Sequence, residues 1–291
     1  MLGYILQSIP PEPWRLLPFS ERSAGEELAA SEALLARLAQ TARPAVRWYG
    51  APRLALVLGS GQRPSEADGA ALAAAGGTLH KRASGGTAVL FVPGFLMQDI
   101  ALPLGHPLRR DDVSESYRWL GELWAEALAA LGIVAEPISI AAARADSAAS
   151  DALLRRACFG GRSPYELLAG GRKLVGFSQI RRRQGALLQV GLYAHWPGRE
   201  LAQLLRMPAD ERGAFAEALA GRVVGLDELL PTVPSPEVIM GAFAAALAHM
   251  HGAALAPQGW RLDEVDALAA ALPRYAPIDS AATLPPPPAS H

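Results

Sequence analysis

Cysteine is almost absent from this 291-residue sequence, which contains only Cys158. A single cysteine excludes an intramolecular disulfide and any zinc site built from several thiolates. It fits a reducing compartment, so we expect a cytoplasmic protein. None of the six histidines has the HExxH spacing or a related one, and the sequence therefore predicts no metal site.

Long apolar runs and an excess of one charge are also missing. No uninterrupted apolar stretch reaches the roughly 18 residues of a membrane span, so we expect a soluble protein that does not enter a membrane. The N-terminus lacks the basic leader and the cleavage site of a secretion signal. A net charge of −1 argues against nucleic acid as a partner and favours small-molecule or protein substrates.

The length suffices for one large folded domain. Residues 1–24 are rich in proline, tryptophan and mixed polar residues, and they predict an irregular lead-in. Residues 276–291 contain four consecutive prolines and predict a disordered tail. The remaining residues, 25–275, are expected to form a single domain.

Apolar periodicity predicts both helices and strands in this domain. Residues with helical spacing predict helices over 25–42, 66–75, 111–131, 237–250 and 262–272, with helical pieces between 208 and 230. Strands are expected over 46–49, 54–58, 100–104, 133–140, 165–168, 173–175 and 186–193. Residues 141–156 are expected to be a polar connection that leads to Cys158.

Cys158 is followed, after a glycine pair, by Lys173, the next lysine after Lys81. Gly170 and Gly171 predict a tight turn between two short strands, which places Lys173 just after a hairpin. A thiol and an ammonium are well suited to an activated acyl group, one as nucleophile and the other as cation. The alternative is structural, with Cys158 a small buried side chain and Lys173 a solvated one.

A second informative stretch spans residues 79–90 and contains a Ser-Gly-Gly sequence. Gly85 and Gly86 allow backbone N–H groups to approach an anion closely, and Lys81 with Arg82 supplies positive charge. Such a loop suits a phosphate or a polarised carbonyl. An ordinary turn is the alternative.

These stretches resemble motifs of the lipoate-protein ligase and octanoyltransferase superfamily. Residues 171–179, Gly-Arg-Lys-Leu-Val-Gly-Phe-Ser-Gln, with Leu-Gln-Val-Gly at 188–191, resemble its lysine motif. Residues 81–89 resemble its Arg-Arg-x-Ser-Gly-Gly-Gly-Ala-Val motif, and Arg-Trp-Tyr at 47–49 resembles its Arg-Phe-Tyr segment. The segment from Cys158 to Leu167 looks like the cysteine loop of the transferase branch, which forms a covalent acyl-cysteine.

The sequence departs from the family pattern at several places. Val190 replaces the motif histidine, and Phe177 and Ser178 stand where Ser and Ala are usual. Residues 91–96, Phe-Val-Pro-Gly-Phe-Leu, replace a His-Asp pair and a Gly-Asn. Such changes imply a roomier or more apolar pocket, a loss of adenylation, or an inactive relative.

The resemblance implies a fold and a set of site residues. The fold is α/β, with mixed, largely antiparallel sheets flanked by helices, as in the catalytic domain of biotin and lipoate protein ligases. Cys158 and Lys173 would be catalytic. The residues that would bind substrate are Arg47, Tyr49, Lys81, Arg82, Ser84, Gly85, Gly86, Thr87, Ala88, Gly176, Ser178 and Gln179.

Three functions follow from the resemblance. In the first, Cys158 takes an octanoyl or lipoyl group from an acyl carrier protein or lipoyl-domain donor and passes it to a lysine of a lipoyl-domain acceptor. Lys173 would lower the thiol pKa and hold the carbonyl oxygen, and no cofactor is needed. In the second, ATP and Mg²⁺ form an acyl-adenylate. The third is a non-catalytic acyl-binding relative, and a biotin-type ligase is disfavoured. The cysteine loop favours the transferase.

Overall fold

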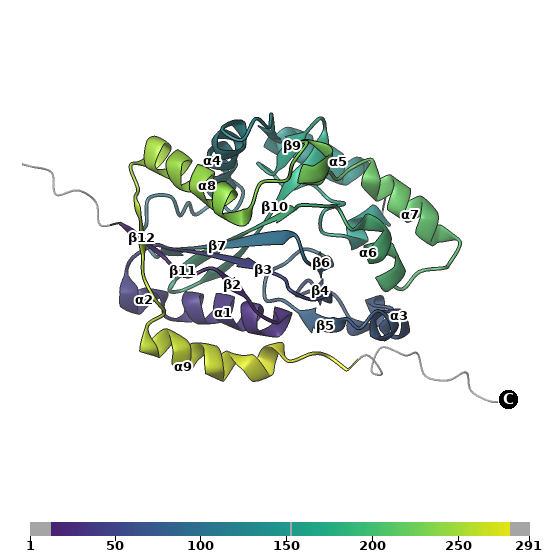
Figure 1. The fold of residues 1–291 in the computed structure, drawn as a ribbon, viewed down its shortest axis with the longest axis horizontal. Helices are drawn as coiled ribbons and strands as arrows, with labels where there is room; N and C mark the ends of the chain where they lie inside the picture. The colour runs from purple at the N-terminus through teal and green to yellow at the C-terminus, as the bar shows by residue number, and fades with distance from the viewer. Residues whose placement is uncertain (1–12, 152, 280–291) are drawn as a thin grey trace, which may run out of the picture.

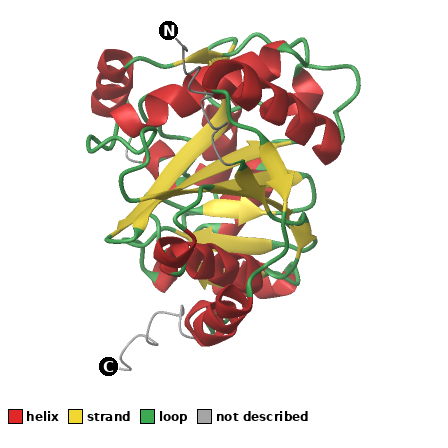
Figure 2. Ribbon diagram, turned by 90° about the vertical axis from the view of Figure 1, so that its left-hand side faces the viewer, coloured by secondary structure: helices red, strands yellow, loops and turns green. Residues whose placement is uncertain are grey.

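The computed structural model describes residues 13–151 and 153–279, which form an α/β fold. A large mixed sheet runs through the middle of the molecule with helices on both faces, and a small sheet lies beside it (Figures 1 and 2). This arrangement confirms the predicted fold class, mixed and largely antiparallel sheets flanked by helices.

The large sheet has its longest strands at its centre. In spatial order the strands are β12 (Leu255–Pro257), β1 (Trp14–Leu16), β3 (Ala45–Gly50), β7 (Phe95–Pro103), β11 (Gly185–Tyr193), β10 (Arg172–Arg182), β9 (Leu167–Ala169) and β8 (Glu136–Pro137), with β2 (Ser20–Glu21) beside β3. The strands β3, β7, β11 and β10 are antiparallel neighbours, while β1 is parallel to both β3 and β12.

The small sheet carries the glycine-rich loop. Its strands are β5 (Thr78–Lys81), β4 (Ala55–Leu58) and β6 (Val89–Phe91). β4 is parallel to β5 and antiparallel to β6, so the loop from Arg82 to Ala88 crosses from one edge of this sheet to the other. Three short helices, α3 (Gly69–Ala74), α6 (Gly198–Leu204) and α7 (Glu211–Ala220), lie at this end of the molecule (Figure 1).

Two helix pairs cover the large sheet on opposite faces (Figure 1). The pair α1 (Ala24–Ala36) and α9 (Leu262–Ala271) covers one face, and α4 (Arg118–Ala129) with α8 (Pro236–His251) covers the other. Ser23 begins α1, because its hydroxyl accepts from the Glu26 N–H while the Glu26 carboxylate accepts from the Ser23 N–H. Because both faces are covered, the central strands are largely buried on both sides.

Several element boundaries differ from the sequence-based expectation. The helix expected over 25–42 breaks at Arg37 into α1 and α2 (Leu38–Thr41), and the helix expected from 111 starts as a 3-10 turn at Glu115. The strand expected over 100–104 is the second half of β7, and the strand expected over 173–175 is the start of the longer β10. The glycine turn before Lys173 is confirmed, since Gly170 and Gly171 join β9 to β10 with positive φ angles.

The region before Cys158 was predicted wrongly. Only Glu136 and Pro137 of the expected strand 133–140 are in β8, and Val134 is 81% exposed. The expected connection 141–156 contains the helix α5 (Ile140–Ala149) and a 3-10 turn over Leu154–Arg156. Ser139 explains the helix start, because its hydroxyl accepts from the Ala142 N–H.

The expected irregular lead-in contains β1 and β2, so that prediction was wrong for Trp14–Leu16 and Ser20–Glu21. Arg15 is buried and forms two hydrogen-bonded contacts of 2.6 and 2.8 Å with the Glu264 carboxylate of α9. At the other end, the Ile278 N–H donates to the Leu79 carbonyl at 2.8 Å. Most of the expected tail, residues 280–291, lies outside the described residues.

Candidate active site

The cysteine loop and the glycine-rich loop are joined through their backbones. The Cys158 N–H donates to the Ala88 carbonyl at 2.8 Å, and the Ala88 N–H donates to the Arg156 carbonyl at 3.2 Å. These two bonds form a short parallel bridge between Ala88 and Ala157. The two motifs that the sequence singled out are therefore parts of one site.

Two cavities meet at Cys158. The first is an open cleft of about 510 Å³ lined by charged and hydroxyl side chains as well as apolar ones, and the second is a narrow slot of about 50 Å³ with a largely apolar lining. Cys158, Phe177 and Ser178 contribute to both. A group held at the thiol can therefore have a polar part in the cleft and an apolar part in the slot.

The floor of the slot is a row of residues that crosses four strands. Gly176 of β10 pairs with Gly191 of β11, which pairs with Met97 of β7, which pairs with Tyr49 of β3. Directly paired residues present their side chains on the same face of a sheet. Since Gly176 and Gly191 have no side chains, the floor of the slot consists of bare backbone on β10 and β11, at the end close to Cys158.

A polar row lies beside this floor, two residues further along each strand. Ser178, Gln189, Asp99 and Arg47 are paired in that order. The Ser178 hydroxyl donates to Gln189 Oε1 at 3.3 Å, Gln189 Nε2 donates to Asp99 Oδ1 at 3.1 Å, and Arg47 Nη2 donates to Asp99 Oδ2 at 2.7 Å. The row is a continuous hydrogen-bonded wall from the reaction site into the core.

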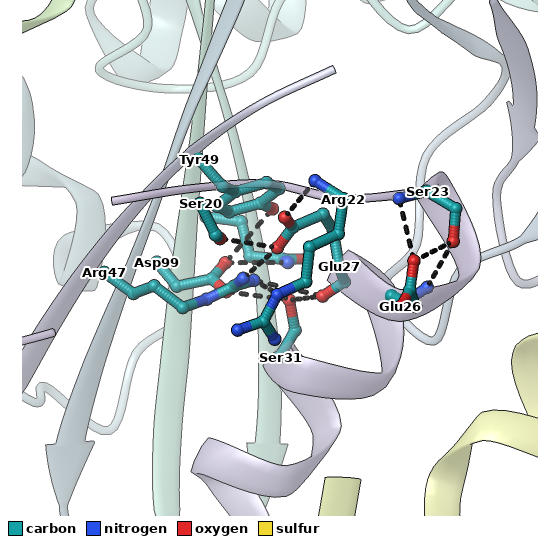
Figure 3. A network of polar contacts seen from close by, with 10 residues as sticks. Ser20, Arg22, Ser23, Glu26, Glu27, Ser31, Arg47, Tyr49 and Asp99 are labelled. Carbon is teal, nitrogen blue, oxygen red and sulfur yellow. Dashed lines mark hydrogen bonds and ion pairs between the residues drawn. The ribbon is translucent and has the colours of Figure 1, made fainter. Parts of the chain in front are cut away.

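Arg47 is at the end of this wall, in a buried network with α1 (Figure 3). Its guanidinium lies between the carboxylates of Asp99 and Glu27 and donates to Ser31 at 2.9 Å. Burial disfavours the charge, yet these two carboxylates raise the pKa of Arg47 above its ordinary value. Arg47 lines neither cavity, so it holds α1 against the sheet and supports Tyr49, which lines the slot.

Arg82 brings a positive charge into contact with the thiol. Its Nη2 lies 3.4 Å from Cys158 Sγ and also donates to the carbonyls of Gly85 and Thr87 at 2.9 and 3.1 Å. A Cβ on Gly86 would lie 2.8 Å from that nitrogen, and Gly86 has a φ of +84°, so both space and backbone favour glycine. Burial opposes ionisation, but Arg82 first and Lys173 second lower the pKa of Cys158.

Lys173 is only 1% exposed and is not the solvated side chain of the structural alternative. Its Nζ lies 2.8 Å from Glu166 Oε1, 3.1 Å from the Gly161 carbonyl and 3.2 Å from the Cys158 carbonyl. An ammonium has three N–H groups, and these three acceptors use all of them. Lys173 lines neither cavity, and it fixes the backbone of the cysteine loop.

Five of the other predicted residues line one of the two cavities. Gly85, Gly86, Thr87 and Gln179 line the cleft, and Gly176 lines the slot. In the described part of the chain, the backbone N–H groups of Gly85, Gly86 and Thr87 donate to no protein acceptor.

Besides Arg47 and Lys173, three further predicted residues do not reach a cavity with their side chains. Ser84 is buried, and its hydroxyl oxygen lies 3.4 Å from that of Ser178. Ala88 contributes only backbone hydrogen bonds, to the cysteine loop. Lys81, at the end of β5, lines neither cavity.

Comparison with known proteins identifies the family. Residues 23–248 match the model of the lipoyl protein ligase A/B catalytic domain. The chain belongs to this family. It is 32% identical over 251 residues to octanoyltransferase LipM of Kyrpidia tusciae, which covers 84% of this chain and 89% of the relative. It is also 30% identical over 275 residues to octanoyltransferase LipM of Moorella thermoacetica. That alignment covers 93% of this chain and 98% of the relative.

Solved structures of lipoate protein ligases share the fold of this lipoyl ligase family member. A bi-partite lipoate protein ligase from Thermoplasma acidophilum, analysed with its E2 lipoyl domain, aligns with a TM-score of 0.74 at 18% identity, over 90% of this chain and 92% of its own. Lipoate-protein ligase A bound with ATP aligns with a TM-score of 0.73 at 18% identity, over 90% of this chain and 95% of its own.

Several side chains of the site were not predicted to have a role from the sequence. Glu166 was recognised only as part of the cysteine loop, although it pairs with Lys173 and accepts from the N–H groups of Ser163 and Phe177 at 2.6 and 2.9 Å. Asp99 and Gln189 were missed as members of the polar wall. The available signal for Asp99 was a carboxylate inside the apolar strand β7.

The described residues contain neither a metal-binding cluster nor a membrane-spanning helix. Within residues 13–151 and 153–279, no three side chains of His, Cys, Asp or Glu converge on a point that suits a metal ion. None of the helices in these ranges has the length and apolar character that a bilayer span requires.

Proposed function

We propose that this chain transfers an octanoyl group from a carrier-protein thioester to a lysine of a lipoyl domain, through a thioester on Cys158. The relatives named octanoyltransferase LipM support this reaction class. The observation that carries the proposal is the position of the Cys158 thiol, at the meeting point of a polar cleft and an apolar slot with a guanidinium 3.4 Å away.

In the first half-reaction, the Cys158 thiolate attacks the thioester carbonyl of the donor. A new C–S bond forms to Sγ, and the bond to the carrier thiol breaks, so the carrier leaves as a thiolate that takes a proton from water. The developing oxyanion lies at the cleft, where the N–H groups of Gly85 and Gly86 are free to donate. The acyl tail lies in the slot.

In the second half-reaction, the amine of the acceptor lysine enters the same cleft after the carrier has left. It attacks the acyl carbonyl, an amide C–N bond forms, and the C–S bond to Cys158 breaks. Arg82 stabilises the thiolate that leaves, because its guanidinium already contacts Sγ. The proton lost by the amine passes to water in the open cleft.

Lys173 acts in this scheme as a positioning residue. Its ammonium holds two carbonyls of the cysteine loop and is neutralised by Glu166, which is also buried. The departures at Phe91 and Val190 fall in the slot, and they make it apolar and narrow rather than roomy.

Partners and cofactors follow from this scheme. The acceptor is a lipoyl domain, and the donor is an acyl carrier protein that holds the acyl group as a thioester. The energy of the donor thioester drives amide formation, so neither ATP nor a metal ion is needed. The protein works in the cytoplasm, where its single thiol stays reduced.

Transfer without ATP tests the proposal. The purified protein is mixed with an apo lipoyl domain and either octanoyl carrier protein or octanoic acid, and the acceptor mass is followed with and without ATP and Mg²⁺. We expect the octanoyl mass gain without ATP, and its loss in Cys158→Ser. A gain that requires ATP and octanoic acid would favour the ligase, and no gain under either condition would favour a non-catalytic acyl-binding protein.

A further inference from the structure

The slot is partly filled by an aromatic ring at a position where the family pattern is polar. We propose that Phe95 sets the upper length of the acyl chain that the slot accepts. This inference rests on the proposed acyl transfer and adds a residue that determines its chain-length specificity.

The Phe95 ring lies directly over the bare backbone of Gly191. A Cβ built on Gly191 would be 2.7 Å from Phe95 Cζ and 2.9 Å from Cε2, so the ring occupies the room that this glycine leaves. Gly191 is the second position of the slot floor, next to Gly176. Adjacent strands are about 4.8 Å apart, so the ring stands one strand spacing away from the β10 end near Cys158.

The ring is held in this position by its neighbours. It stacks on Tyr193 with 4.0 Å between ring centroids and 18° between planes, and the Tyr193 hydroxyl donates to the Leu90 carbonyl at 2.7 Å. Phe91 and Phe159 lie at 5.6 and 6.2 Å from the Phe95 ring centroid. A ring packed on several sides is a wall and not a freely moving gate.

The free volume of the slot makes this wall decisive. The slot has about 50 Å³ of free volume, so there is little spare room beside the ring. Each methylene added to an acyl chain therefore competes with the Phe95 ring for the same space. Removing the ring would join its volume to the space above Gly191 and allow a longer chain.

Loading of the thiol with acyl chains of different length tests the assignment. N-acetylcysteamine thioesters with four to twelve carbons are supplied singly, and the rate of the acyl mass gain is measured for the wild type, Phe95→Ala and Phe95→Leu. We expect the rate for the twelve-carbon chain, relative to the eight-carbon chain, to rise about tenfold in Phe95→Ala. Phe95→Leu, which disturbs folding less, should rise by a smaller factor.

Phe215→Ala is the matched control, because Phe215 is fully buried in the separate core around the small sheet. It should lower the melting temperature without changing the ratio of the two rates. An unchanged ratio in both Phe95 variants, with normal loading by the eight-carbon chain, would overturn the role of Phe95 alone. No loading of the wild type by any chain would overturn the acyl transfer and, with it, the role of Phe95.

A second measurement checks the geometry without using activity. Gly191→Ala should lower the melting temperature of the wild type, because the new methyl group meets the Phe95 ring. In Phe95→Ala the same substitution should cost much less, since the ring is gone. An equal cost in both backgrounds would contradict the contact on which the proposal depends.

Discussion

At the scale of residues, the Arg82 guanidinium contacts the thiol, whereas Lys173 contacts Glu166 and the backbone of the cysteine loop. The motif resemblance implied that Lys173 both lowers the thiol pKa and holds the acyl oxygen. In the structure Lys173 contributes to the lowered pKa of Cys158, but its three N–H groups are used by Glu166 and two carbonyls. Among the residues that the structure describes, Arg82 alone donates to Sγ, so it is the group whose loss should affect the thiol most.

Replacing Arg82 should make the thiol harder to ionise. The Arg82 guanidinium lies against the thiol and favours the thiolate, so Arg82→Met should raise the pKa of Cys158. The thiolate reacts with iodoacetamide, so the alkylation rate falls as the pH drops through the pKa. This fall should occur at higher pH in Arg82→Met than in the wild type.

Lys81→Met is the control for this experiment, because Lys81 precedes Arg82 but lines neither cavity. Its pH profile should match that of the wild type. If Arg82→Met also matches the wild type, Arg82 does not hold the thiolate.

At the scale of elements, the site depends on strand pairing that the sequence did not reveal. The motifs located the two loops and the glycine turn, because they are local and rich in residues with special backbone or chemical properties. They could not show that Gly176, Gly191, Met97 and Tyr49 share one row, since this requires the register of four strands far apart in sequence. The polar wall was missed for the same reason.

The lead-in was misread because its strand has no local signal. β1 has three residues, and it is held by parallel pairing with β3 and β12 and by the contact of Arg15 with Glu264. All these partners are remote in sequence. Local periodicity describes helices such as α8 well, but it does not detect a short strand that is defined by distant neighbours.

Breaking the contact between β1 and α9 should destabilise the whole domain. Arg15 and Glu264 are 2% and 0% exposed, and Glu264→Ala would leave the arginine charge buried without its carboxylate. The expected loss in the free energy of unfolding is about 3–5 kcal/mol, measured by urea denaturation.

The adjacent residue of α9 provides the control for Glu264→Ala. Asp263 pairs with Arg261 at the surface, with exposures of 33% and 44%, so Asp263→Ala should cost only about 0–1 kcal/mol. A loss of the same small size in Glu264→Ala would show that β1 contributes little to the stability of the domain.

At the scale of the whole molecule, the fold brings three distant regions to one point. The glycine-rich loop of the small sheet, the cysteine loop and the centre of the large sheet meet at Cys158, between a polar cleft and an apolar slot. Both proposed partners reach the thiol through the same cleft. The donor must therefore leave before the acceptor enters. Between these two steps the acyl group must stay bound to the protein.

The most direct test of this account is to trap that waiting state. The protein is incubated with octanoyl carrier protein, without ATP and without an acceptor, and its intact mass is measured before and after hydroxylamine treatment. We predict one octanoyl mass increment, located on the peptide that contains Cys158 and removed by hydroxylamine. If Cys158 stays unmodified under these conditions, and the same protein still transfers octanoyl to the lipoyl domain once the acceptor is added, the account is contradicted.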